Sequence, residues 1–137
     1  MIVADTSALI AFYSESGPQH DAVASWLAEH NGTMVVSPYV VAELDYLVAT
    51  RKGVDAELAV LTELASGAYE LAEIGPADVA VAASVIERDR DLGIGLIDAS
   101  LVVLAERYRT NTILTLDRRH FGALRSLSGE PLHIVPT

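Results

Sequence analysis

The chain has 137 residues, of which 51% are hydrophobic, and its formal net charge is −10 at pH 7. This length fits one domain spanning residues 1–137, and the apolar content suffices for a single core. The acidic charge argues against a bulk electrostatic grip on nucleic acid, because non-specific affinity comes mainly from Lys and Arg neutralising phosphates. Any nucleic-acid role must therefore be local or bridged by a cation.

Cysteine is absent, which rules out disulfides, thiolate zinc sites and cysteine nucleophiles and fits a reducing cytoplasm. The first residues, MIVADTSALI, contain no basic stretch and reach an acid at Asp5, so they are not typical of a signal peptide. No apolar run is long enough to span a bilayer. We therefore expect a cytoplasmic protein without a membrane partner.

Short apolar or β-branched runs alternate with helical patterns along the chain. Strands are expected at Met1–Ala4, Thr33–Val36, Glu70–Ala72, Thr112–Leu116 and His133–Val135. Helices are expected at Ser7–Tyr13, His20–His30, Pro38–Thr50, Ala56–Ser66, Ala77–Asp91 and Asp98–Arg109. This alternation predicts a three-layer α/β/α sandwich, in which helices cover both faces of a parallel sheet of about five strands.

The helix expected at Pro38–Thr50 is apolar on almost every side. One face of a sheet cannot bury such a helix completely, so the pattern predicts a homodimer or partner interface built on it and on its neighbour Ala56–Ser66. The alternative is burial of the whole helix inside the same domain.

Four acidic residues lie where the chain passes from a strand into a helix. Asp5 and Asp117 directly follow expected strands, Glu43 lies early in a helix, and Asp98 begins one. In a parallel sheet the strand ends and helix starts meet at the same edge, which is where open α/β folds bind ligands. We therefore expect these four carboxylates to converge.

Each acid also has a purely structural interpretation. Asp5 and Asp98 are good N-caps for the helices that follow them. Asp117 is typical of an Asx turn leading into Arg118 and Arg119. These interpretations suffice for each acid singly, but four acids at one edge favour a shared function.

Glu43 is the acid that is hardest to explain structurally. It is in line with Val40 and Leu47 beside the apolar face of its helix, where an unpaired charge is costly. Asp45 borders the opposite flank, so helical geometry alone does not choose between the two. Because Glu43 lies nearer the helix start, and hence the strand ends, we assign it to the acid group and expect Asp45 to be solvated or to support the group indirectly.

Oxygen ligands without His or Cys select Mg²⁺ or Mn²⁺ over zinc. Such ions activate water and stabilise the negative charge that builds on a phosphoryl group. The acid pattern therefore predicts a site for one or two such ions, with phosphoryl-transfer chemistry.

Four segments of the chain resemble the PIN-domain nucleases, and in particular the toxins of bacterial VapBC toxin–antitoxin pairs. They are IVADTSALI, the AEL of SPYVVAEL, IDASL and LTLDRRHF. None is specific alone, but their order and spacing cover nearly the whole chain. The resemblance implies a PIN-like sheet of order 3-2-1-4-5.

The resemblance also implies a function. Relatives of this kind are Mg²⁺- or Mn²⁺-dependent endoribonucleases that cut structured RNA such as tRNA or rRNA, form dimers, and are neutralised by a cognate VapB-type antitoxin. Asp5, Glu43, Asp98 and Asp117 match the family's acidic cluster. On this resemblance we expect Asp5, Glu43 and Asp98 to hold a first ion, and Asp117 to bind it through water or to help hold a second. Ser7 matches the position expected to orient Asp5 or a water on the metal.

A basic stretch accompanies the last acid. From Arg107 to Arg125 the chain has five arginines and a single acid, Asp117. We predict that this stretch flanks the site and that Arg118 and Arg119 contact the RNA backbone. The alternative is an ordinary solvated surface, and His120 beside it could be a proton donor or a plain surface residue.

Two other functions compete with the nuclease. A phosphohydrolase or phospho-acceptor domain also places an Asp after its first strand, but Asp5-Thr6-Ser7 lacks the second Asp of the haloacid-dehalogenase motif and no Lys follows a later strand. A catalytically inactive RNA- or protein-binding module would keep the fold without cutting. The complete acid set argues against such a degenerate site.

Overall fold

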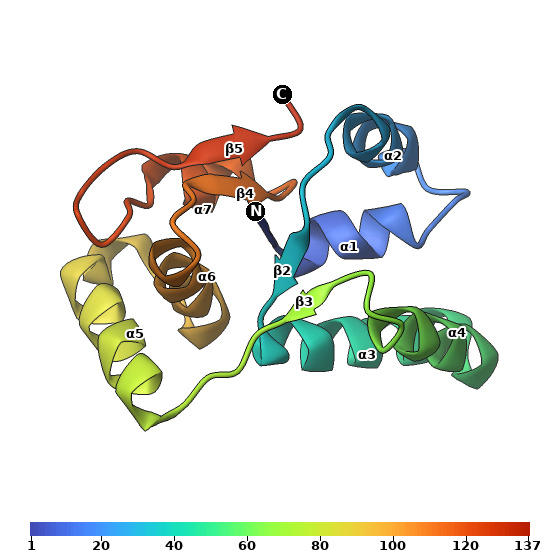
Figure 1. The fold of residues 1–137 in the computed structure, drawn as a ribbon, viewed down its shortest axis with the longest axis horizontal. Helices are drawn as coiled ribbons and strands as arrows, with labels where there is room; N and C mark the ends of the chain where they lie inside the picture. The colour runs from blue at the N-terminus through green and yellow to red at the C-terminus, as the bar shows by residue number, and fades with distance from the viewer.

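The computed structural model describes residues 1–137 as a five-stranded sheet between two layers of helices (Figure 1). The strands are β1 (Ile2–Ala4), β2 (Met34–Val36), β3 (Glu70–Leu71), β4 (Thr112–Leu114) and β5 (His133–Val135). All neighbouring strands pair in parallel, in the order β3-β2-β1-β4-β5. The sheet, its order and the three-layer architecture are thus confirmed.

Seven α-helices and one 3₁₀ turn surround the sheet. They are α1 (Thr6–Phe12), α2 (His20–Glu29), α3 (Pro38–Lys52), α4 (Val54–Leu64), α5 (Pro76–Arg88), η1 (Arg90–Leu92), α6 (Leu96–Arg107) and α7 (Arg118–Ala123). Figure 1 shows α1 to α4 on one side of the sheet and α5 to α7 on the other. This split follows from right-handed crossovers that first run from β1 to β3 and then return to β4 and β5.

The carboxyl edge of the sheet differs from expectation in three places. Strand β4 ends at Leu114, two residues early, so that Thr115 lies beyond the paired strand. Helix α6 begins at Leu96 with Gly95 as its N-cap, which moves Asp98 into the first turn. Helix α7 was not expected, because its six residues are too few to display a helical period.

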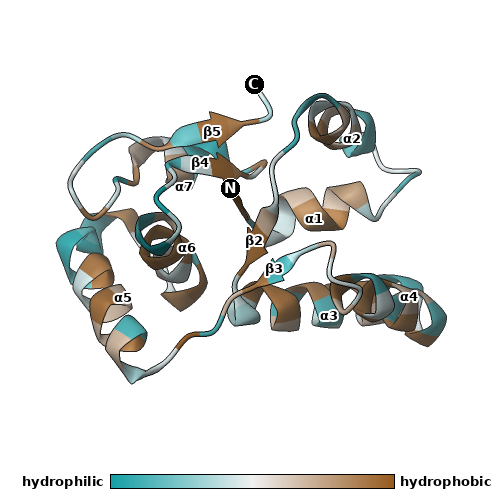
Figure 2. Cartoon of the chain, viewed as in Figure 1, coloured by the Kyte–Doolittle hydropathy of each residue, from teal (hydrophilic) through white to brown (hydrophobic).

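The core is formed by the central strands and α6. Val3, Val35 and Ile113 are fully buried, as expected for strands covered on both faces. Seven consecutive residues of α6, from Ala99 to Ala105, are buried because this helix lies between the sheet and α5. Figure 2 shows hydrophobic colouring on β2 and along much of α6, whereas β3 and the start of β5 carry hydrophilic residues.

Helix α3 is only partly covered by the domain. Val40, Leu44 and Val48 are buried, and the helix packs against α1 and α4. Tyr46 of α3 remains 66% exposed, and Leu58 of α4 remains 56% exposed. Burial inside the domain therefore explains one stripe of the helix, while the interface on its outer side stays a prediction.

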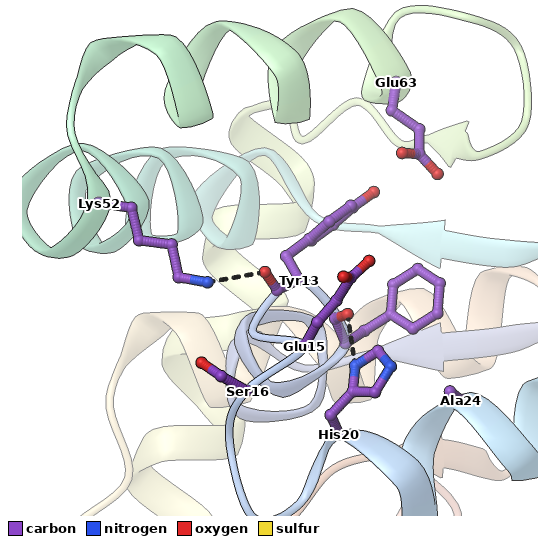
Figure 3. Close-up of a pocket in the computed structure, with 8 residues that line it drawn as sticks. Tyr13, Glu15, Ser16, His20, Ala24, Lys52 and Glu63 are labelled. Atoms are coloured by element: carbon purple, nitrogen blue, oxygen red, sulfur yellow. Dashed lines mark hydrogen bonds between the residues drawn. The ribbon is translucent and has the colours of Figure 1, made fainter.

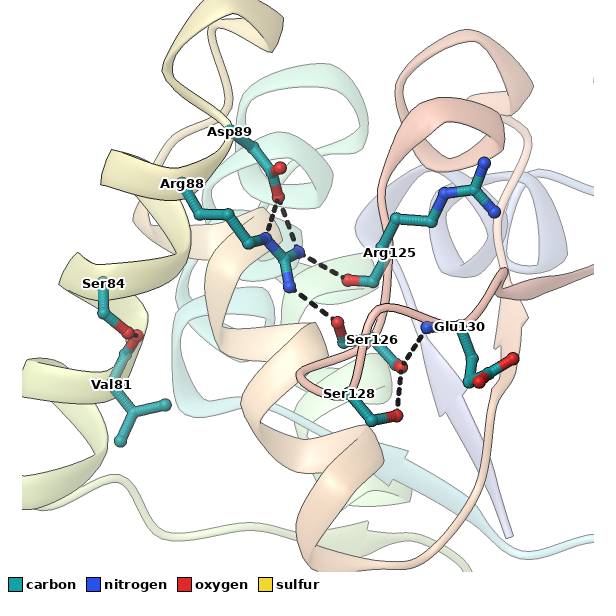
Figure 4. A network of polar contacts seen from close by, with 8 residues as sticks. All are labelled: Val81, Ser84, Arg88, Asp89, Arg125, Ser126, Ser128 and Glu130. Carbon is teal, nitrogen blue, oxygen red and sulfur yellow. Dashed lines mark hydrogen bonds and ion pairs between the residues drawn. The ribbon is translucent and has the colours of Figure 1, made fainter.

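The segment after α7 is fastened to the end of α5 by one arginine. The guanidinium of Arg88 donates hydrogen bonds to the carbonyls of Ser126 (2.7 Å) and Arg125 (2.8 Å) and pairs with Asp89 at 2.6 Å (Figure 4). These bonds satisfy the carbonyls of an irregular segment that no strand pairs continuously. They also fix the path of the chain between α7 and β5.

None of the helices combines the length and the apolar character that crossing a membrane requires.

Candidate active site

The four predicted acids meet in one cleft at the carboxyl edge of the sheet. Its volume is about 360 Å³, and Asp5, Glu43, Asp98 and Asp117 all line it, each from a different segment of the chain. Ser7 of α1 lines it as well. The expected convergence of the carboxylates is therefore present, while their catalytic roles remain a prediction.

Asp5 is held by two hydroxyl groups. The hydroxyls of Ser7 (2.8 Å) and Thr115 (2.7 Å) both donate to the carboxylate oxygen Oδ2. Asp5 has the position of an N-cap for α1, but its side chain makes no capping hydrogen bond. The capping interpretation is therefore wrong for Asp5, whose side chain is turned into the cleft-side network instead.

The backbone after β4 determines the direction of these two hydroxyls. The N–H of Leu116 donates to Ser7 Oγ (2.9 Å), and the N–H of Asp117 donates to Thr115 Oγ1 (3.0 Å). Each hydroxyl has one hydrogen, and both hydrogens are directed to Asp5. The two hydroxyl oxygens, 3.1 Å apart, are therefore in contact without a hydrogen bond between them. The early end of β4 thus allows its chain to hold the carboxylate that follows β1.

Asp98 lies in a partly buried position among like charges. Burial, together with the negative charges of Asp5, Asp117 and Glu43, raises the pKa of Asp98 to about 6, and the nearby His120 opposes this rise. The side chain is not an N-cap, because Gly95 has that place. A carboxyl with such a raised pKa is typical of a functional site in which a bound cation would offset the negative charges.

Asp117 combines a structural and a cleft position. Its side chain caps α7 by accepting a hydrogen bond from the His120 N–H (3.2 Å), and its other oxygen lies 3.0 Å from His120 Nδ1. The predicted turn role is therefore present as a helix cap, and Asp117 still lines the cleft. His120 is paired with this acid rather than free on the surface.

The structure separates Glu43 from Asp45. Glu43 lines the acid cleft, whereas Asp45 faces α4, where its hydrogen bond raises the pKa of Glu57. Asp45 is half-buried with its Oδ1 fully buried, and it does not line the cleft. It is therefore not the fully solvated acid that was one expectation, while an indirect supporting role stays a prediction. The assignment of Glu43 to the acid group, made from its position near the helix start, agrees with its place in the lining of the cleft.

A buried hydrogen bond fixes the two helices that carry Glu43 and Asp98. Ser37 and Ser100 are almost fully buried, and their hydroxyl oxygens lie 2.9 Å apart. The Ser100 hydroxyl donates to the Ile97 carbonyl, so the Ser37 hydroxyl is the donor between them. This bond links the start of α3 to the first turns of α6.

The donor set fits a hard divalent cation, although the acids stand apart. No three His, Asp or Glu side chains form a ready-made ligand cluster. The four acids nevertheless share one cleft, and burial together with the repulsion of the other three carboxylates raises the pKa of Asp98. Every acid there offers oxygen, and the buried hydroxyl of Thr6 at the same cleft has no hydrogen-bond partner. These groups suit Mg²⁺ or Mn²⁺.

The arginines are distributed differently from expectation. Arg107 pairs with Asp78 of α5 at 2.8 Å, and Arg109 follows α6 at the edge where β4 begins. Neither lines the acid cleft, so the prediction that the stretch from Arg107 to Arg125 flanks the site does not hold for its first two arginines. Arg118 and Arg119 are exposed on α7 beside Asp117, and Arg118 donates to the Pro136 carbonyl.

Sequence reasoning missed two residues of the site. Thr115 was assigned to a strand, although its hydroxyl bonds Asp5. Arg51, at the end of α3, is the one basic residue that lines the acid cleft. The signal for Arg51 is its spacing of eight residues from Glu43, which places both on one helical face.

Comparison with known proteins identifies the family. The model of the PIN domain matches residues 2–126. The chain belongs to the PIN-domain family. This PIN domain is 56% identical over 135 residues to Ribonuclease VapC26 of Mycobacterium tuberculosis. The alignment covers 98% of this chain and 100% of that protein. The resemblance noted in the sequence is thereby confirmed.

Solved structures agree with the fold of this PIN domain. VapC20 of Mycobacterium tuberculosis, described as a sarcin–ricin loop cleaving toxin, has a TM-score of 0.80 and 18% identity and covers 88% of this chain and 92% of its own. VapBC of Salmonella typhimurium bound to DNA has a TM-score of 0.72 and 15% identity, with 98% and 96% covered. A toxin–antitoxin complex from Klebsiella pneumoniae has a TM-score of 0.70 and 16% identity, with 99% and 97% covered.

Proposed function

We propose that this PIN domain is a Mg²⁺- or Mn²⁺-dependent endoribonuclease, the toxin of a toxin–antitoxin pair. The observation that carries the proposal is the meeting of four carboxylates from four separate segments of the chain in one cleft. Full-length similarity to a protein named as a ribonuclease supports the reaction class. The target class is structured RNA such as tRNA or rRNA, which is supported by a structural neighbour that cuts the sarcin–ricin loop.

In the proposed mechanism Asp5, Glu43, Asp98 and Asp117 hold the divalent cation. When bound, the cation supplies the Lewis acidity that activates water and offsets charge on the phosphoryl group. Ser7 and Thr115 keep the Asp5 carboxylate in one orientation through their hydroxyl bonds. His120 Nδ1 lies 3.0 Å from Asp117 Oδ2 and helps to orient that carboxylate.

The proposed partners are an antitoxin and a second copy of the chain. Several structural neighbours are toxin–antitoxin complexes, which supports a VapB-type antitoxin for this chain. The exposed apolar side chains Tyr46, Val54 and Leu58 on α3 and α4 support a homodimer at that face. Arg118 and Arg119 stay proposed contacts to the RNA backbone, from the helix that Asp117 caps.

The decisive experiment is digestion of labelled tRNA and rRNA with Mn²⁺ and with EDTA. We expect cleavage only with the metal, and its loss in Asp5→Asn and Asp98→Asn variants that stay folded. Asp21→Asn, which removes an exposed acid from α2, is the matched control and should cut normally. An Asp5→Asn variant with full metal-dependent activity would contradict the proposed site.

The same experiment separates the competing functions. Binding of RNA without chelator-sensitive cleavage would indicate an inactive binding module. A phosphohydrolase would require a trapped aspartyl phosphate on Asp5. No Lys lines the cleft to serve a phosphate there, and one oxygen of Asp5 is already held by two hydroxyls, which argues for the nuclease.

A further inference from the structure

The acid cleft continues into a second groove. This groove has a volume of about 260 Å³ and runs between α1, the α1–α2 loop and the end of α3. It shares Ser7, Ile10 and Arg51 with the acid cleft. A polymeric ligand bound at the acids can therefore extend into the groove without leaving the protein surface.

The groove differs in charge from the rest of the molecule. Its lining contains no Asp or Glu, although the chain has 19 acids and a net charge of −10. Its ionisable side chains are Arg51 and His20, and Ser14 and Gln19 add neutral polar groups. A polyanion entering from the acid cleft would meet donors and no repelling charge there.

Arg51 stands at the junction of the two spaces. It follows Glu43 by two helical turns, with Leu47 between them on the same face of α3. Its guanidinium has no ion pair or hydrogen bond within the protein, and the residue is exposed. A guanidinium without an internal partner is free for bidentate bonding to a phosphate.

We propose that this groove binds the RNA strand on one side of the cut, with Arg51 on the phosphate next to the scissile one. The assignment rests on the proposed nuclease function and adds the path of its substrate. The scissile phosphate lies at the acids, where a cation offsets its charge. The neighbouring phosphate lies beyond that cation, and Arg51 is the basic group at the cleft that supplies the charge there.

The groove also has a natural end. At His20 it meets a wider cleft of about 600 Å³, where the acids Glu15 and Glu63 reappear (Figure 3). Lys52 in that cleft already donates to the Tyr13 carbonyl at 2.9 Å. The favourable stretch for an RNA strand therefore extends from Arg51 to His20 and stops there.

Two variants test the groove without touching the acids. Arg51→Gln removes the charge, and Gln19→Glu introduces an acid at an exposed position in front of α2, where a helix N-terminus tolerates negative charge. Arg109→Asn is the matched control, because it removes one exposed arginine at the opposite edge and Asn accepts the positive φ of that residue. All three are compared with the wild type on labelled tRNA and rRNA with Mn²⁺, after thermal unfolding confirms the fold.

We expect Arg51→Gln to raise KM about tenfold and to lower the salt slope of RNA binding by about 0.7, the value for one phosphate of a single strand. Gln19→Glu should raise KM about threefold or more, and Arg109→Asn should change it less than about twofold. An unchanged KM in both Arg51→Gln and Gln19→Glu would overturn the proposal that the groove binds RNA. It would do so even if either variant weakened the binding of a protein partner. A wild type that does not cut RNA overturns the proposed function itself, which is a separate outcome.

Discussion

Replacing Asp98 with Asn should stabilise the fold and remove the function at the same time. In the folded protein the pKa of Asp98 is about 6, against 3.8 for an unperturbed Asp. The folded state therefore binds this proton more tightly than the unfolded state, and ionised Asp98 destabilises the fold above pH 6. As the pH falls from 8 to below 4, Asp98 becomes protonated and the wild type regains the stability that its ionisation cost. The Asn variant has no group that ionises at this position, so its stability does not change for this reason.

The size of the effect follows from the same shift. About two pKa units correspond to at most about 3 kcal/mol. Partial exposure of the side chain reduces this value, and Asn also loses the favourable interaction of a negative charge in the first turn of α6, about 0.3–1 kcal/mol. We expect a net gain of about 1–2 kcal/mol in the free energy of unfolding at pH 8, or about 5 °C in Tm.

Thermal and urea unfolding in EDTA at pH 8 and pH 4.5 measure this difference. Asp98→Asn should exceed the wild type at pH 8 and approach it at pH 4.5, while Asp21→Asn should show no gain at either pH. Added Mn²⁺ should raise the Tm of the wild type and of Asp21→Asn, but raise that of Asp98→Asn much less. A variant that is less stable than the wild type at pH 8 in EDTA would refute the reasoning that the acids repel one another.

Three further changes test other parts of the molecule. Thr115→Val removes a fully buried hydroxyl that bonds the first acid, and should cost about 1–2 kcal/mol of stability and at least tenfold in RNA cleavage; equal activity would show that this bond is dispensable. Arg118→Glu with Arg119→Glu should weaken RNA binding and flatten its salt dependence, measured by titration at several salt concentrations, and an unchanged slope would remove these residues from the interface. Tyr46→Ser with Leu58→Ser should shift sedimentation from dimer to monomer with the fold intact, whereas an unaltered association state would place the interface elsewhere.

The sheet was predictable because its strands lie in short apolar or β-branched runs that helical patterns separate. The order of the strands was different: it came with the family resemblance, since no local pattern records which strands are neighbours. Boundaries failed where single residues decide them. Helix α6 begins at Leu96, two residues before the expected Asp98, with Gly95 as its N-cap. The polar start of α7 hid a helix that Asp117 caps.

The acids of the site were predictable because each follows the end of a strand or the start of a helix. Residues whose role depends on tertiary contacts were not. Thr115 looks like any β-branched strand residue until β4 ends early and its hydroxyl reaches Asp5. Arg51 lines the cleft because α3 runs along it, whereas Asp45 lies on the flank of α3 toward Glu57 of α4 and outside the cleft.

The two hydroxyls on Asp5 Oδ2 also bear on which ion the cleft prefers. Ca²⁺ takes six to eight oxygen ligands and readily uses both oxygens of a carboxylate, whereas Mg²⁺ requires a compact octahedron of single oxygens. With one oxygen occupied by Ser7 and Thr115, Asp5 can offer only the other as a monodentate ligand. The hydroxyl pair would thereby act as a filter against the larger ion, although neither residue need touch metal or RNA.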